Sequence, residues 1–364
     1  MRRALFLSFM CILVITVHVA AGEIAVDFAH PKFARLDADG KKLVSEYAKT
    51  YPKIKEFYDN MRMDVTVKTM DVLSEKSLQT LKKIGESRGL NEMEYKELIE
   101  RASHTEKLYE MRHRVSEKYS RIDRKQNHPV TPSVRAKLPH ELSQLDYLQE
   151  SVITLLTPTM GYQLSRNDPR NQYFSLNVKQ DFTKSNNGGV EIEVLYFDGA
   201  AFSSEATPLE EILFQCPPAI DGVPYRVVEY VQQKEIAGEQ VVEIRLVSSR
   251  HLDSNPDNIH GIIRLYRDSW VVKDAFSRTQ IVSPGKYFGE IGWIRTSCTY
   301  DGELNGVPIM RTYQRYSGDF DKETQEEKLA RQIHCEVTKL VPGPPDLSEF
   351  DVAQFLPPGA EIGK

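Results

Sequence analysis

The stretch Met61-Arg-Met-Asp-Val-Thr-Val-Lys68 alternates apolar and polar side chains at every position. Successive side chains of a β-strand point to opposite faces, so Met61, Met63, Val65 and Val67 would share one face. The stretch therefore predicts a strand with one buried face.

The residues before this strand have a helical spacing that starts at Asp39. Pro52 lies within this run and is expected to break or kink the helix, because proline lacks an amide donor and clashes with the preceding turn. The apolar members recur every three or four positions and would lie on one helix face: Val44, Tyr47, Tyr51, Ile54 and Tyr58.

The residues after the strand begin with a strongly charged helical insert at about 74–105. The next segment, 108–125, fits a helix and a strand alike, and both remain open at this point. Its many arginines and lysines fit either a solvated basic face or a phosphate-binding strip. We favour the solvated face, because the chain is acidic overall and few aromatic side chains interleave with the basic ones.

Beyond Pro129 the pattern changes to many short apolar runs separated by turn residues. The turn sequences include Asn186-Asn-Gly-Gly189, Asp301-Gly302 and Asn305-Gly306. So many successive strands without long helices between them predict an α+β fold, in which the amino-terminal helices pack against an antiparallel sheet. They argue against a parallel dinucleotide-binding sheet.

The first 22 residues have the organisation of a secretory signal peptide. Arg2 and Arg3 precede an apolar run, residues 4–19, and small residues follow it. The run is shorter than the roughly 20 residues of a membrane-spanning helix. We expect cleavage near Ala21 or Gly22, a periplasmic or secreted mature chain, and no integral membrane segment after cleavage.

Export would place Cys216, Cys298 and Cys335 in an oxidising compartment. If the three strand segments between residues 292 and 340 form a simple meander, Cys298 and Cys335 lie two strands apart. That separation is about 9.6 Å, which is beyond the reach of a disulfide. We therefore expect no disulfide, and we expect Cys298 and Cys335 to be buried.

The composition is that of a folded, water-soluble protein, with 364 residues, 40% hydrophobic, 27% charged and a formal net charge of -5. A net negative charge disfavours a nucleic-acid partner. The chain contains neither a Gly-x-Ser-x-Gly nucleophile elbow nor a His-Glu-x-x-His zinc helix. We therefore predict no catalytic residue, no metal site and no cofactor, and a protein that is not an enzyme.

Several pieces of the chain together resemble a family of secreted bacterial proteins that are similar to the lipoprotein-localisation factors LolA and LolB. The pieces are Phe57-Tyr-Asp-Asn-Met61, Lys118-Tyr-Ser-Arg-Ile-Asp123, Val152-Ile-Thr-Leu-Leu-Thr-Pro-Thr-Met-Gly-Tyr-Gln-Leu164, Pro344-Pro-Asp-Leu-Ser-Glu-Phe350 and Phe355-Leu-Pro357.

The resemblance implies a strongly curved antiparallel sheet, an incomplete and half-open barrel, with helices on its concave face. It implies one domain over residues 23–341 that contains the charged insert. A proline-rich tail, 342–364, would follow and run extended over the surface, with Phe350 and Phe355 as its anchors.

In the LolA and LolB carriers the concave cavity holds the acyl chains of a lipoprotein, so the resemblance implies a hydrophobic or amphiphilic ligand here. The partner would be a lipid or a lipoprotein. The alternative is an interaction or scaffold module with a filled core, whose partner is an envelope protein. The residues expected to line the cavity are Met63, Val65, Val67, Ile153, Leu155, Ile244, Leu246, Ile263 and Leu265.

Overall fold

The computed structural model describes most of the chain between Ile24 and Phe355. The expected leader, with its cleavage site near Ala21 or Gly22, lies outside the described residues, as does Cys216. The described residues are 24–72, 75–103 without 88, 106–129 without 117 and 118, 147–167 without 158 and 159, 174–181, 199–200, 207–208, 213–214, 226–248, 259–283, 286–320, and 324–355 without 325.

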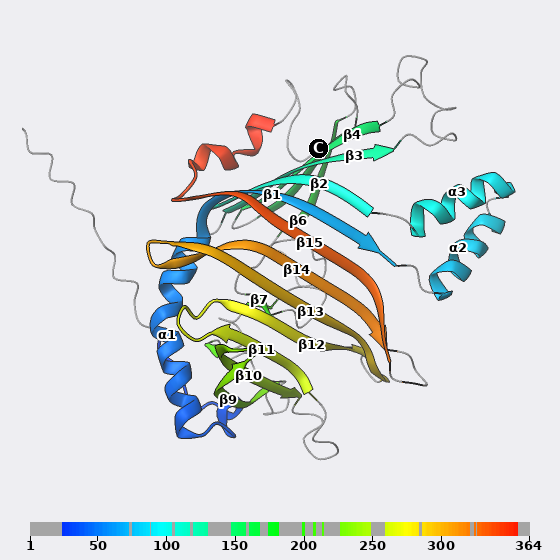
Figure 1. Cartoon of the computed structure of the whole chain (residues 1–364). Coiled ribbons are helices and arrows are strands. Elements are labelled where there is room, and N and C mark those ends of the chain that lie inside the picture. Colours follow the sequence, from blue (N-terminus) through cyan, green and yellow to red (C-terminus); the bar gives the residue numbers. More distant parts are fainter. Residues whose placement is uncertain are drawn as a thin grey trace, which may run out of the picture.

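The fold is built on one open antiparallel sheet, in which the described residues form 13 strands in the order β6-β5-β4-β3-β2-β1-β15-β14-β13-β12-β11-β10-β9. The sheet curves and is not closed into a barrel, since β6 and β9 lie at its two edges (Figure 1). A separate pair is formed by β7 (Gly199–Ala200) and β8 (Thr207–Pro208). The strands of the large sheet are β1 (Asn60–Asp71), β2 (Glu106–Ser116), β3 (Tyr119–Pro129), β4 (Tyr147–Leu156), β5 (Met160–Asn167), β6 (Phe174–Asp181), β9 (Arg226–Ile236), β10 (Glu239–Ser248), β11 (Ile259–Tyr266), β12 (Val272–Ser283), β13 (Lys286–Leu304), β14 (Val307–Phe320) and β15 (Glu327–Pro342).

The strand order shows two meanders that meet in the middle of the sheet. Strands β1 to β6 form one meander and β9 to β15 the other, and they are joined by antiparallel pairing of β1 with β15. The predicted strand at 61–68 is confirmed as part of β1, and its four apolar side chains are 0–2% exposed. We call the face of the sheet that holds these side chains the inner face, and the opposite face the outer face.

The ambiguous segment 108–125 is a β-hairpin formed by β2 and β3, with Ser116 paired to Tyr119 at its turn. The late meander is also confirmed. Cys298 of β13 pairs with Tyr313 of β14, and Tyr313 pairs with Cys335 of β15, so the two cysteines lie two strands apart. Both cysteines are buried and form no disulfide, and burial raises the pKa of Cys298 to about 12.

Helix α1 (Ala38–Asp59) packs on the inner face. Its amino terminus is capped by Asp37, whose carboxylate accepts a hydrogen bond from the Gly40 amide at 2.7 Å. The helix runs along one side of the sheet, from β9 to β1 (Figure 1). It continues through Pro52, so of the break or kink expected there the break is wrong. Tyr47 and Tyr51 are buried against Phe214, and Tyr47 also contacts Trp270.

Helices α2 (Glu75–Ser87) and α3 (Glu92–Ser103) confirm that the 74–105 segment is helical. They pack against each other, with Tyr95 beside Gly85, and lie beyond the ends of β1 and β2 (Figure 1). The expectation that the amino-terminal helices pack against the sheet therefore holds for α1 and not for this pair. The reason is topological: the pair connects two neighbouring strands and is placed where those strands end.

The chain after β15 forms two short 3-10 helices, η3 (Leu347–Phe350) and η4 (Val352–Phe355), where an extended tail was expected. Phe350 is 3% exposed and packs with Leu155 and Val352, so this anchor is confirmed. The side chain of Phe355 lies outside the described residues.

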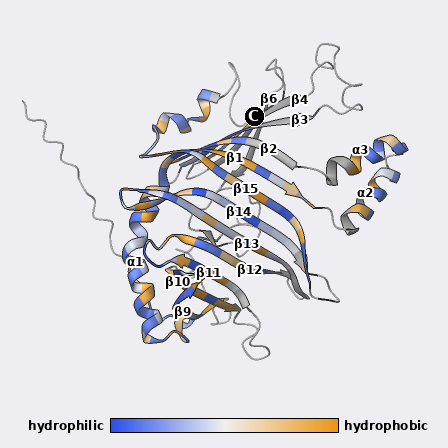
Figure 2. Ribbon diagram, viewed as in Figure 1, coloured by the Kyte–Doolittle hydropathy of each residue, from blue (hydrophilic) through white to orange (hydrophobic). Residues whose placement is uncertain are grey.

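Hydrophobic and hydrophilic residues are mixed along the strands and along α1 (Figure 2), as expected for elements with one buried and one solvated side. In the described part of the chain, no helix has the length and apolar character needed to span a membrane.

Candidate functional site

Seven of the nine residues expected to line a cavity lie together in the main core, each at most 2% exposed. These seven pack in one cluster with side chains of α1, among them Val44, Tyr51 and Ile54. In this conformation the described wall of the expected cavity is therefore filled by the helix. The seven residues are Met63, Val65, Val67, Ile244, Leu246, Ile263 and Leu265.

The other two, Ile153 and Leu155, lie on the outer face, so their assignment to the same wall is wrong. Leu155 is fully buried, but against Phe350 and Val352, and Ile153 is half-buried. Val152 of β4 faces inward instead and is 3% exposed. The run at 152–155 has apolar side chains on both faces, and alternation cannot assign a face in such a run.

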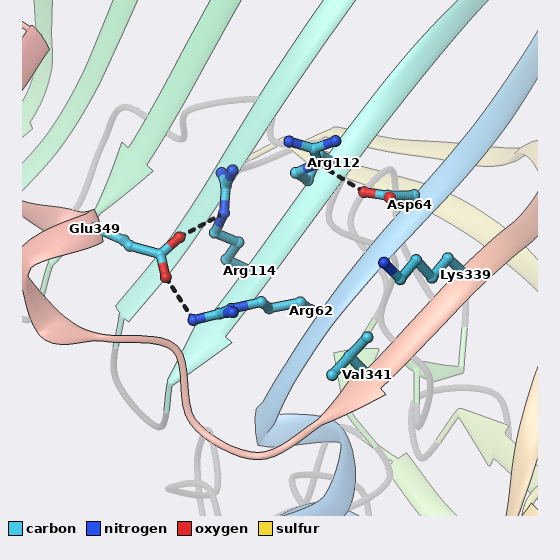
Figure 3. A pocket seen from close by; sticks show the side chains of 7 residues that line it. All are labelled: Arg62, Asp64, Arg112, Arg114, Lys339, Val341 and Glu349. Carbon is cyan, nitrogen blue, oxygen red and sulfur yellow. Dashed lines mark hydrogen bonds and ion pairs between the residues drawn. The ribbon is translucent and has the colours of Figure 1, made fainter.

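A hollow of about 300 Å³ lies on the outer face where β1, β2 and β15 meet η3 (Figure 3). We call it the arginine pocket. Four of its lining side chains are basic, two are carboxylates and one is apolar: Arg62, Arg112, Arg114, Lys339, Asp64, Glu349 and Val341.

Three arginines stand side by side across neighbouring strands at this pocket. Arg62 of β1 is directly opposite Arg114 of β2, which is directly opposite Arg121 of β3. Like charges at such positions repel each other. The repulsion is offset by Asp123, which pairs with Arg114 and with Arg121 at 2.9 Å, and by Glu349.

Glu349 reaches this row from η3, far along the chain. One carboxylate oxygen accepts a hydrogen bond from Arg62 at 2.6 Å, and the other lies 2.8 Å from Nε of Arg114. The Glu349 carbonyl accepts a further bond from Arg121 at 2.9 Å. The side chains of Arg114 and Arg121 are only 10% and 13% exposed, so water and salt screen these ion pairs less than they screen exposed ones.

A second row of charges runs beside the first. Lys339 of β15 is opposite Asp64 of β1, which is opposite Arg112 of β2. Asp64 accepts a 2.8 Å hydrogen bond from Arg112, and this bond raises the pKa of Arg112. Among the described residues Lys339 forms no ion pair, and its side chain points toward the middle of the pocket (Figure 3).

One histidine–serine pair is close enough for a hydrogen bond, between His113 Nε2 and Ser120 Oγ at 2.9 Å. His113 is 2% exposed, and burial lowers its pKa to about 4. Within the described chain its Nδ1 has no hydrogen-bond partner, so no carboxylate orients the ring as a catalytic triad requires. No three potential metal ligands of the described residues lie together either.

Sequence reasoning noticed the basic segment 108–125 but missed the pocket. Arg112 and Arg114 come from that segment. Strand pairing brings Arg62 and Lys339 to it, and the packing of η3 on the outer face brings Glu349. The available signal was that Arg62 and Asp64 occupy the polar positions of the opening strand. Their strand partners could not be read from periodicity.

No family model and no curated protein matches the chain. Among solved structures, a dehydratase domain from the CurJ module of curacin polyketide synthase is similar at 13% sequence identity. The match covers 61% of this chain and 93% of that domain, with a TM-score of 0.11. A score this low supports no statement about fold or activity.

Proposed function

We propose that the protein is an exported, non-enzymatic protein of the cell envelope that binds the acyl part of a lipid or lipoprotein between α1 and the inner face. The scaffold would be LolA-like. The observation that supports the proposal is the open, curved antiparallel sheet with an apolar inner face on which one long helix packs.

Binding at this place requires α1 to move, because the helix fills the described wall. The contacts that hold α1 are mainly apolar, and a hydrocarbon chain offers contacts of the same kind. Each methylene group taken from water contributes about 0.8 kcal/mol. Polar contacts also join the helix to the sheet region: Glu46 pairs with Arg267 at 2.6 Å, and the Tyr58 hydroxyl donates to the Pro308 carbonyl at 2.5 Å.

A second candidate is an envelope scaffold with a permanently filled core. The observation that favours it is the burial of Val65, Leu246, Ile263 and the other inward-facing wall residues, which leaves them no open space in this conformation. The two candidates differ in whether α1 separates from the sheet.

The test is titration of the delipidated protein with a fluorescent fatty acid. A variant with Glu46→Cys, Arg267→Cys and Cys216→Ser, joined by a short bis-maleimide, would tie α1 to the loop after β11. The matched control joins Arg311→Cys to Glu336→Cys, which replaces an ion pair of the same 2.6 Å length between β14 and β15. We expect saturable binding that the first crosslink reduces at least roughly tenfold and the control leaves unchanged.

The two proposals give different results in this titration. Absence of saturable binding to protein with an intact circular dichroism spectrum would reject the carrier and support the scaffold. Equal binding with and without the α1 crosslink would reject the placement of the ligand beneath α1. Amino-terminal sequencing of the exported protein tests the leader, and the expected new terminus follows Ala21 or Gly22.

A further inference from the structure

We infer that the arginine pocket on the outer face binds a phosphate-type oxyanion, and that Glu349 is its built-in competitor. The pocket is on the face opposite the apolar residues of the proposed carrier site. The inference therefore stands apart from the proposed function, and either can fail without the other.

The first argument is the charge of the lining. Arg62, Arg112, Arg114 and Lys339 face two carboxylates, Asp64 and Glu349, so the lining is net positive although the chain as a whole is net negative. A concave surface concentrates such a local potential. An anion that enters the pocket therefore meets a net positive charge, although the chain as a whole is net negative.

The second argument is that the pocket already holds an anion. The Glu349 carboxylate lies between Arg62 and Arg114 with contacts of 2.6 and 2.8 Å, the lengths of charge-assisted hydrogen bonds. Arginine binds phosphate oxygens with the same donor geometry that it uses for a carboxylate. The tail thus shows which atoms of the pocket would bind an external oxyanion.

The third argument is that the pocket has unused capacity. Its volume is about 300 Å³, and the described structure gives Lys339 no ion pair. Arg62 and Arg112 have side chains that are 46% and 58% exposed, so donors of both can be reached from solvent. A phosphate group would bind to Lys339, Arg62 and Arg112 together, and it would compete with Glu349 for Arg62.

The experiment is isothermal titration of the exported full chain with inorganic phosphate at low ionic strength. Glu349→Gln removes the competing charge and keeps the shape of the side chain, so we expect the dissociation constant to fall roughly fivefold. Lys339→Gln removes the positive charge of a side chain that has no ion-pair partner among the described residues. We expect it to raise the dissociation constant for phosphate roughly fivefold.

The matched control is Glu336→Gln. Glu336 is also an outer-face carboxylate of the sheet, but it pairs with Arg311 at 2.6 Å and does not line the pocket. Its substitution should therefore leave the dissociation constant for phosphate within about 1.5-fold of the original value. Equal effects of Glu349→Gln and Glu336→Gln would overturn the inference, since both change the net charge alike. Undetectable binding by both the unchanged chain and Glu349→Gln would overturn it as well.

Lipid vesicles distinguish a lipid headgroup from a soluble phosphate as the source of the oxyanion. Phosphatidylglycerol vesicles are compared with pure phosphatidylcholine vesicles in a sedimentation assay. Retention on the anionic vesicles that Lys339→Gln weakens would identify a lipid headgroup as the source. Phosphate binding without retention would identify a soluble phosphate or phosphate ester, and either result supports the oxyanion site.

Discussion

The buried histidine of β2 shows how a single side chain depends on the sheet around it. His113 lies on the inner face in register with Met63 on one side and Ile122 on the other. Among the described residues its ring forms one hydrogen bond, with Ser120, and its Nδ1 has no partner. Burial therefore favours the neutral ring, and the pKa falls to about 4.

The pKa of His113 predicts a loss of stability in weak acid. In the unfolded chain the imidazole takes up a proton near pH 6.5, whereas in the folded protein it does so near pH 4. The stability that depends on the neutral ring is thus fully present above pH 6.5. As the pH falls toward 4, the free energy of unfolding decreases by about 3 kcal/mol. Urea unfolding at a series of pH values measures this loss.

The matched variant for this prediction is His113→Gln, which keeps a polar group near Ser120 and cannot gain a proton. Its free energy of unfolding should be lower at neutral pH and should vary less between pH 6.5 and 4. If the unchanged chain and the variant show the same slope in that interval, another group is responsible for the acid sensitivity.

At the scale of elements, the segment after β15 is held to the outer face by two kinds of contact. Phe350 packs on Leu155 and against Tyr119, with ring centroids 5.5 Å apart in the aromatic pair. Glu349, the neighbouring residue, binds Arg62 and Arg114. Apolar burial fixes the position of η3, and the ion pairs fix its orientation.

Phe350→Ala tests the apolar part of this attachment. Removing a ring that is 3% exposed should lower the free energy of unfolding by about 3 kcal/mol, because a cavity is left above Leu155. Leu347→Ala in the same 3-10 helix is the control, since Leu347 is 60% exposed and its loss should cost less than about 0.5 kcal/mol. Denaturant unfolding compares the two, and similar costs would show that η3 does not depend on Phe350.

At the scale of the whole molecule, the pairing of β1 with β15 makes one sheet of two meanders. At this junction the edge strand of each meander is paired with the edge strand of the other. Helix α1 contacts both meanders, through β9 and through β1. Residues far apart in the chain must therefore order together, and we expect the two meanders to unfold as one cooperative unit.

The test of cooperativity uses the location of the two tryptophans. Trp270 and Trp293 both belong to the meander of β9 to β15, whereas circular dichroism reports on the entire sheet. Ile122→Ala in β3 removes a buried side chain of the other meander and should cost about 2 kcal/mol. We expect the tryptophan and dichroism midpoints to shift together, and a tryptophan midpoint that stays in place would show independent meanders.

The sequence alone was enough to identify several of the elements and some of their buried faces. The apolar set of β1, the helical spacing of α1, the charged helices α2 and α3, and the separation of Cys298 from Cys335 all follow from local patterns. Local patterns are sufficient here because the side-chain periods of strands and helices are set by backbone geometry. The antiparallel class followed in the same way from the short connections.

Only the tertiary structure decided which strands pair, which face Ile153 and Leu155 occupy, and that Arg62, Lys339 and Glu349 meet at one pocket. Register between strands depends on contacts summed over the whole sheet, and shifting it by one residue exchanges the two faces. The opening alternation of residues 61–68 thus determined a strand and its buried side. The partners of its polar side were decided by β2, β15 and a turn of helix near the end of the chain.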